Sequence, residues 1–279
     1  MTNHYDLTGK TALVAGGGKN LGGLISRQIA EAGADVAIHY NCEGSRSEAK
    51  ETLSAVQAAG RTGVLLQGDL TNPATVTSVF DDAKDALGGL DIAVNTVGKV
   101  LRKPIMETTE DEYDSMLDIN AKAAYFFLKE AGLKLNDNGQ VITLVTSLMN
   151  AITDGYSTYA GGKSPVEHFN RAAAREFAER GIAVNAVGPG PMDTPFFYGQ
   201  ETPERVEFHQ SMAIGGPAHY DRGYSPRGAV LGHRGRLDYR PDNLPEWRLN
   251  HPLRCGPAEC RCRLHRYAPA WLNTPAAAA

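Results

Sequence analysis

Long hydrophobic runs and a leader-like start are both missing from this 279-residue sequence. No apolar run approaches the roughly 18 residues that a membrane-spanning helix needs. The first ten residues are polar and lack the basic-then-apolar layout of a signal peptide. With only four cysteines, 42% hydrophobic and 22% charged residues, the chain does not fit the disulfide-scaffold, disordered or collagen-like classes. We therefore expect a cytoplasmic globular protein with no membrane contact.

Neither sign of charge is in large excess, because the formal net charge is only -4. This balance argues against a nucleic-acid partner. That value averages two unlike regions. Residues 1–216 hold 18 basic and 27 acidic side chains, whereas 217–279 hold 10 and 5. The second region has no Lys, Ile or Phe but eight of the 15 prolines and three of the four cysteines. Such a composition supplies little core, so we treat 217–279 as anomalous.

The first region alternates short apolar runs with amphipathic stretches. Buried strands are predicted at 11–15, 35–40, 63–68, 90–95, 140–146 and 182–187, and helices at 21–32, 46–59, 73–87, 109–133 and 158–180. Strict alternation predicts a single α/β domain, residues 1–216, with a doubly wound parallel sheet covered by helices on both faces. Ligands of such sheets bind at the carboxyl ends of the strands.

A glycine-rich turn follows the first predicted strand and reads A-G-G-G-K-N-L-G-G from Ala15 to Gly23. Glycines let the backbone approach a pyrophosphate, and the helix that follows offers free N–H groups to the anion. A tight strand-to-helix connection would need similar residues. The position after the first strand of an alternating pattern favours a dinucleotide.

The end of the second strand indicates which dinucleotide. It reads His39-Tyr40-Asn41 and lacks the acidic residue that would bind a ribose 2′-hydroxyl, which disfavours NAD. Lys19 and Arg46 could pair with a 2′-phosphate, so NADP is preferred. The alternative is that both cations are merely solvated.

Further polar residues follow the later strands in order. Gly68-Asp69-Leu70 follows the third strand, Asn95-Thr96-Val97-Gly98 the fourth, and Ser147 the fifth. Asn120 lies within the long fourth helix. Tyr159 and Lys163 are four residues apart, so they share one face if one helix contains both.

This set of motifs resembles the short-chain dehydrogenase/reductase family over residues 7–200. The family's tyrosine-x-x-x-lysine signature is present as Y-A-G-G-K, its upstream serine as Ser147, its N-N-A-G as N-T-V-G, and its P-G as Pro189-Gly190. Two departures occur in the turn, where Ala15 replaces a threonine and Asn20 a glycine. Asn is the non-glycine residue most tolerant of positive φ, so we expect the turn to be retained.

The resemblance implies a Rossmann-type fold and a cofactor site along the strand ends. The resemblance places Thr194 on the nicotinamide carboxamide and makes the following segment, to about Met212, a mobile substrate lid. The family is usually a homo-oligomer, joined through the fourth and fifth helices and the final strand, so we expect a homo-oligomer if the C-terminus is native. No metal is implied. The expected cofactor-binding residues are Gly16, Gly18, Lys19, Asn20, Leu21, Gly22, Tyr40, Asn41, Arg46, Asp69, Leu70, Asn95, Val97, Gly98, Tyr159, Lys163, Pro189, Gly190 and Thr194.

The chemistry implied is hydride transfer to or from a small carbonyl or alcohol. Such a reaction develops negative charge on the substrate oxygen, which needs a proton donor and a hydrogen-bond donor. Tyr159 would donate the proton, and the Lys163 ammonium would lower the pKa of this phenol from near 10. By resemblance Ser147 would hydrogen-bond the substrate oxygen, and Asn120 would hold a water that links Lys163 to solvent.

The final quarter lacks the last helix and strand that this family has. Cys255, Cys260, Cys262 and His265 lack the usual spacing of a zinc site, so we predict no metal there. Reverse translation of residues 221–240 with permitted codons, read from the second base, gives I-E-D-I-A-P-V-V-R-F-L-V-T-E-G-G-W-I-T. Residues 241–252 can continue as G-Q-T-I-F-P-N-G-G-S-T-T-R, which resembles the missing helix and strand. We therefore expect a one-base frame shift near Gly216 and a disordered tail over 217–279.

The sequence thus predicts an NADP(H)-dependent short-chain reductase or dehydrogenase acting on a ketone or secondary alcohol. The resemblance is nearest to 3-oxoacyl-acyl-carrier-protein reductases. Two alternatives remain open, a nucleotide-binding regulatory protein on the same fold and an inactive frame-shifted enzyme.

Overall fold

The computed structural model describes residues 6–151, 153–192 and 194–211. The predicted out-of-frame tail and its cysteine cluster lie outside these residues. Within the described ranges, no helix combines the length and apolar character needed to cross a membrane.

Six strands form one parallel sheet in the order β3-β2-β1-β4-β5-β6. They are β1 Thr11–Ala15, β2 Asp35–Tyr40, β3 Gly63–Gln67, β4 Ile92–Asn95, β5 Gln140–Leu144 and β6 Ala183–Val187. The strand order reverses between β1 and β4, which creates the crevice where open α/β sheets bind ligands. This Rossmann-like arrangement confirms the predicted fold class.

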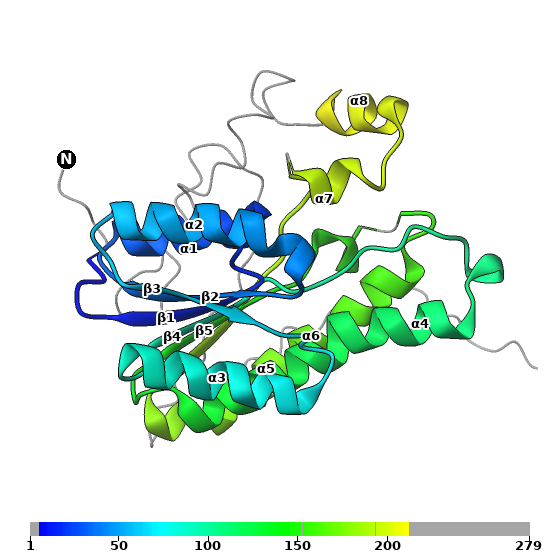
Figure 1. The fold of residues 1–279 in the computed structure, drawn as a ribbon. Coiled ribbons are helices and arrows are strands. Elements are labelled where there is room, and N and C mark those ends of the chain that lie inside the picture. Colours follow the sequence, from blue (N-terminus) through cyan, green and yellow to red (C-terminus); the bar gives the residue numbers. More distant parts are fainter. Residues whose placement is uncertain (1–5, 152, 193, 212–279) are drawn as a thin grey trace, which may run out of the picture. The chain divides into compact units, whose positions relative to one another are not determined.

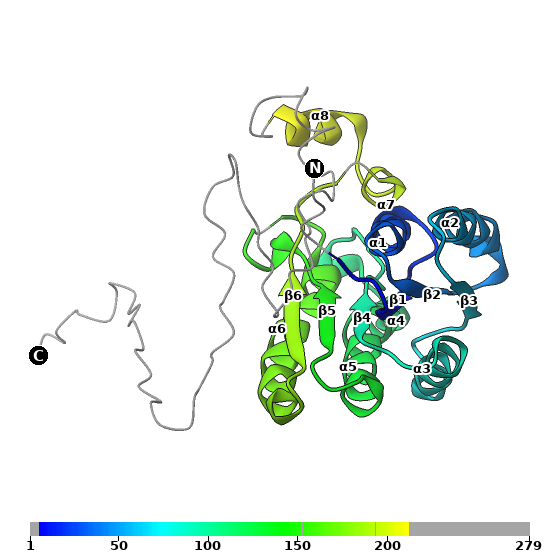
Figure 2. The ribbon, with the colours of Figure 1, turned by 90° about the vertical axis from the view of Figure 1, so that its left-hand side faces the viewer.

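Helices pack on both faces of the sheet, with α1 and α2 on one face and α3, α5 and α6 on the other (Figures 1 and 2). The helices are α1 Asn20–Glu31, α2 Arg46–Ala58, α3 Pro73–Leu87, α4 Glu110–Leu117, α5 Ala123–Lys134, α6 Ser157–Glu176, α7 Pro195–Tyr198 and α8 Pro203–Ser211. Helices α7 and α8 were not predicted, and both lie in the segment that we expected to form the lid.

The core divides into two apolar layers because side chains alternate along each strand. Val14 of β1 belongs to the layer beneath α1 and α2, with Ile29 and Val56. Leu13, its neighbour, belongs to the opposite layer, where the rings of Phe80 and Phe127 meet edge to face at 5.0 Å. Both rings are fully buried, and burying a side chain of this size stabilises the fold by about 1.5–3 kcal/mol.

The fourth predicted helix, 109–133, is interrupted in the structure. Thr109 and Glu112 form a reciprocal capping box that starts α4, and a π-helical turn, Asp118–Lys122, separates α4 from α5. A π turn inserts one residue into the helical hydrogen-bond ladder and is common at functional sites. Apolar periodicity does not reveal such an insertion, because the turn keeps a helical composition.

His39 of β2 connects the ends of three neighbouring strands. Its Nδ1 accepts a hydrogen bond from the Gly16 N–H at 3.1 Å, and its Nε2 lies 2.8 Å from the Gly68 carbonyl oxygen. Nδ1 therefore carries no proton, and Nε2 donates to Gly68. Burial lowers the pKa of His39 below 6.5, although Gly68 and Asp69 act in the opposite direction.

This lowered pKa predicts a loss of stability in acid. Below about pH 6.5 the unfolded chain takes up a proton on this histidine more readily than the folded chain, so the free energy of unfolding falls with pH. Replacing His39 with Asn should lower the melting temperature near neutral pH and flatten its decline between about pH 6.5 and about pH 5. Thermal melts across this range measure both effects. His168→Asn, on the exposed face of α6, is the control. An unchanged decline in His39→Asn would contradict the assignment.

Candidate active site

The turn after β1 folds back so that the start of α1 packs closely against the backbone of the turn. Gly16 has φ +73°, and a Cβ on Gly22 would lie 2.1 Å from the Gly16 carbonyl oxygen. Asn20 adopts φ +50°, the conformation that its replacement of a glycine requires. The turn is therefore retained despite the substitution, and it leads directly into α1 as a phosphate-binding turn does.

Helix α2 and the segment after β4 hold this turn in place. The Thr52 hydroxyl of α2 donates to the Gly18 carbonyl at 2.8 Å, and the Thr96 hydroxyl after β4 donates to the Ala15 carbonyl at 2.8 Å. A Cβ on Gly18 would lie 3.4 Å from Cβ of Tyr40 at the end of β2. The turn thus borders the ends of both β2 and β4.

The two cations predicted to select NADP each have an acidic partner. Lys19 lies 3.5 Å from Glu48, and Arg46 lies 2.9 Å from Glu43. The Lys19 and Arg46 side chains are 46% and 48% exposed, so these ion pairs are weak and can be exchanged for another anion. Asn41 beside them is exposed, and the Tyr40 hydroxyl donates to Gln67.

The predicted residues after β3 and β4 face different surroundings. The exposed Asp69 carboxylate accepts hydrogen bonds from the backbone and hydroxyl of Thr71. Leu70 is buried in the core, so its side chain packs inside the protein. Asn95 is buried and accepts from the Val97 N–H at 2.9 Å, which shapes the loop toward Gly98.

Lys163 of α6 reaches this loop with a buried amine. Its Nζ donates to the carbonyl oxygens of Val97 at 2.9 Å and Leu144 at 3.0 Å. A Cβ on Gly98 would lie 2.9 Å from this Nζ, so glycine is needed there. Burial lowers the pKa of Lys163 from 10.5 to about 8.

Asn120 supports the same loop from the π turn. Its side chain is fully buried, accepts from the Lys99 N–H at 3.2 Å, and donates to the carbonyls of Lys99 and Met116. The predicted role was to hold a water next to Lys163. In the structure its side-chain amide bonds to the backbone and fixes the position of the loop after β4, and the water-holding role stays a prediction.

Tyr159 lies one turn before Lys163 on α6 and is nearly buried. Its ring is 6.4 Å from the rings of both Tyr156 and Phe196. Burial raises the pKa of Tyr159 above 10, and hydrogen bonding to Thr146 partly offsets this rise. We expected Lys163 to lower this pKa. The net direction of the pKa is upward because desolvation by burial is the largest effect.

The hydroxyl beside Tyr159 belongs to Thr146, a residue that the sequence analysis did not select. Thr146 is buried at the end of β5, and its Oγ1 also accepts from the Leu148 N–H at 3.2 Å. Ser147 begins the following turn, where its N–H donates to the Pro189 carbonyl at 3.0 Å. Two adjacent hydroxyl residues were the available signal, but sequence alone does not show which of them faces the tyrosine.

The loop after β6 completes this edge of the sheet. Pro189 is joined to Ser147 through its carbonyl, and Gly190 beside it is half-buried. Thr194 directly precedes α7, where its carbonyl accepts from the N–H groups of Phe197 and Tyr198. The described residues contain no cluster of His, Cys, Asp or Glu able to hold a metal.

Comparison with known proteins shows the family. The family model described as Enoyl-(Acyl carrier protein) reductase matches residues 16–217. A hydroxynaphthalene reductase, arp2, from Aspergillus fumigatus is 36% identical over 67% of this chain and 67% of its own length. The short chain dehydrogenase mdpC of Emericella nidulans is 33% identical over 70% of this chain and 73% of its own. The chain belongs to the short-chain dehydrogenase/reductase family of oxidoreductases.

Solved structures agree with this result. A dehydrogenase from Burkholderia cenocepacia with bound NADP is 54% identical, with a TM-score of 0.74, over 78% of this chain and 82% of that one. A blue fluorescent protein from a metagenomic library, in complex with NADPH, is 33% identical, with a TM-score of 0.69, over 73% of this chain and 82% of that one.

Proposed function

We propose that this chain transfers a hydride between NADP(H) and a ketone or secondary alcohol. The observation that carries the proposal is the meeting of Tyr159, Thr146 and the buried Lys163 amine at the carboxyl ends of the strands, beside the glycine turn. Gly22 and Gly98 have no room for a side chain, so only their backbone borders this edge of the sheet. A backbone without side chains fits the close approach of a dinucleotide.

The protein's own groups supply the proton chemistry, and the nicotinamide supplies or accepts the hydride when bound. Because burial keeps the pKa of Tyr159 above 10, its phenol is protonated at neutral pH and serves as the acid in carbonyl reduction. A hydroxyl beside it donates to the developing oxyanion. Lys163 places a positive charge behind this pair when protonated, below about pH 8.

The oxyanion hydroxyl belongs to Thr146 or to Ser147. Contact with Tyr159 supports Thr146, whereas the Ser147 backbone is bound to Pro189 and its side chain is only half-buried. We propose Thr146 as the hydroxyl donor and keep Ser147 as the alternative predicted from the sequence.

Single replacements separate these roles. Tyr159→Phe should lower kcat by about 10²- to 10⁴-fold while NADPH binding is retained, because only the proton donor is lost.

Thr146→Ala should lower kcat by about 10²- to 10³-fold, and Thr146→Ser should restore it. Ser147→Ala should stay within a few-fold of the parent. Steady-state kinetics on ketones and NADPH titration measure both parameters, with Ser78→Ala on the exposed face of α3 as control.

The reverse ranking of the two hydroxyl variants would assign the role to Ser147. Full turnover by Tyr159→Phe would reject the proposed proton donor. If the parent chain binds NADPH but reduces no ketone, the regulatory alternative is favoured over the enzyme.

The preference for NADP rests on the cations beside the turn. Lys19 lies in the turn and Arg46 at the start of α2, and each forms an ion pair with a solvent-accessible carboxylate that a 2′-phosphate could replace. The NADP-bound and NADPH-bound relatives support this choice. Charge-assisted bonds to phosphate are stronger than bonds between neutral groups.

Removing both cations should weaken NADPH binding by at least about tenfold more than NADH binding, since only NADPH has the 2′-phosphate. The Lys19→Ala, Arg46→Ala double variant is titrated with each cofactor. Arg171→Ala, which breaks an equally exposed ion pair on α6, is the control. Equal losses for the two cofactors would show that these cations do not recognise the phosphate.

We also propose that the chain forms a homo-oligomer through α4, α5 and α6, the surface that does not depend on residues 217–279. Tyr113 of α4 and Tyr125 and Leu133 of α5 are exposed, which is typical of a helix face that meets another copy. Sedimentation of the full chain distinguishes a monomer from an oligomer.

We propose, finally, that residues 217–279 are translated one base out of frame. The recovered second-base reading supports this, and the family match ends at residue 217, next to the inferred shift at Gly216. Sequencing the gene around the Gly216 codon decides the question. If a shift is found, the kinetic variants should also be made in the frame-restored chain, which should be more stable and more active than the parent.

A further inference from the structure

Glu201, between α7 and α8, is a buried carboxylate that hydride transfer does not require. Its side chain is only 2% exposed. It accepts a hydrogen bond from the Tyr156 hydroxyl and pairs with Arg102 at 3.4 Å and Arg205 at 3.2 Å, and His209 lies 4.0 Å away. A carboxylate buried among so many donors is fixed in position.

This carboxylate lies one aromatic ring away from the proposed proton donor. The Arg102 guanidinium lies over the Tyr156 ring, 5.9 Å from its centroid, and that ring meets Tyr159 at 6.4 Å. Val100 and Leu101, which precede Arg102, pack in the same apolar cluster. Arg102 is therefore a second cation, besides Lys163, close to a substrate bound at Tyr159.

A cavity of about 340 Å³ opens beside Arg102. It is lined by Arg102, Lys103, Pro104, Asp154, Gly155, Gly199 and Gln200. Gly155 and Gly199 come from the two segments that carry Tyr156 and Glu201, and Arg102 connects the cavity to both, because it pairs with Glu201 and lies over the Tyr156 ring.

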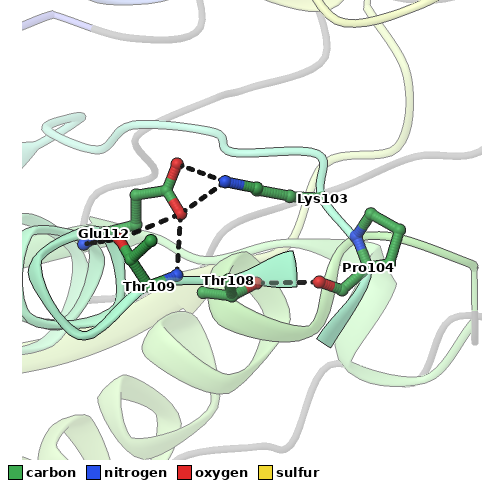
Figure 3. A network of polar contacts seen from close by, with 5 residues as sticks. All are labelled: Lys103, Pro104, Thr108, Thr109 and Glu112. Carbon is green, nitrogen blue, oxygen red and sulfur yellow. Dashed lines mark hydrogen bonds and ion pairs between the residues drawn. The ribbon is translucent and has the colours of Figure 1, made fainter. Parts of the chain in front are cut away.

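Both cations of this lining have internal partners. The Lys103 amine lies 2.8 Å from each carboxylate oxygen of Glu112, which also belongs to the capping box of α4 (Figure 3). Arg102 is paired with Glu201. Asp154 adds an exposed negative charge to the same wall. Arg205 also pairs with Glu201, so among the described residues the lining and its partners hold three cations and three carboxylates, and no unpaired cation is left to bind an anion.

We infer that Glu201 determines substrate charge, by neutralising Arg102 so that the site accepts neutral carbonyl compounds and rejects those with a carboxylate distant from the reacting carbonyl. The inference rests on the proposed reductase function. A substrate carboxylate near Arg102 would also lie near Glu201 and Asp154, and such repulsion is an effective source of specificity.

A matched pair of probes tests this inference in the full chain. Methyl 4-acetylbenzoate and 4-acetylbenzoate share one ketone and differ in charge at the far end. The parent should favour the ester in kcat/KM by at least about tenfold. Glu201→Gln keeps the shape but leaves Arg102 without its charged partner, so the preference should shrink by at least about tenfold, mainly through a lower KM for the acid. Glu207→Gln, exposed on α8, is the control and should keep the parent ratio.

A second variant tests the inference if Glu201→Gln does not fold, and a binding measurement tests it if the chain does not turn over either probe. Arg102→Gln leaves Glu201 paired with Arg205 and should strengthen the preference for the ester. Calorimetric titration of both probes with NADP⁺ present gives the same ratio without turnover, and thermal melts confirm folding.

The outcomes separate the two claims. A parent that accepts acid and ester equally, or a folded Glu201→Gln variant with the parent ratio, would overturn the charge-selection inference and leave the reductase proposal intact. The expected binding ratios without reduction of either probe would support charge selection and reject the reductase proposal.

Discussion

The buried amine of Lys163 is the constraint on which the rest of the site depends. Burying an ammonium group is costly unless its donors are satisfied, and here the carbonyls of Val97 and Leu144 accept from it. Those carbonyls come from the ends of β4 and β5, so the parallel order of these strands creates the acceptor pair. Gly98 is required beside them because any side chain would collide with Nζ.

The π turn is a second consequence of the same constraint. Asn120 sits in that turn and bonds to both backbone groups of Lys99, which holds the loop that presents Val97. An Asn on a regular helix is commonly solvent-facing, but here it is fully buried. The irregular helix, the glycine and the buried lysine therefore form one arrangement and not three separate features.

Much of this fold could be predicted from the sequence, because short apolar runs and glycine turns are local signals. All six strands and the positive φ of Asn20 follow from such signals. Three features could not be predicted in this way. The π turn leaves no mark on apolar periodicity, the choice between Thr146 and Ser147 depends on the direction of adjacent side chains, and the partners of Glu201 come from segments far apart in the chain.

The proton chemistry and the charge selection both depend on groups that are buried around the Tyr156 ring. Burial keeps Tyr159 protonated and lowers the pKa of Lys163, so both groups titrate away from their ordinary values. The most direct test is NMR titration of the Lys163 side chain in the full chain, with the signal assigned by its loss in Lys163→Gln. The account predicts a pKa of about 8. A value near the ordinary 10.5 would show a solvated amine and contradict the buried site described here.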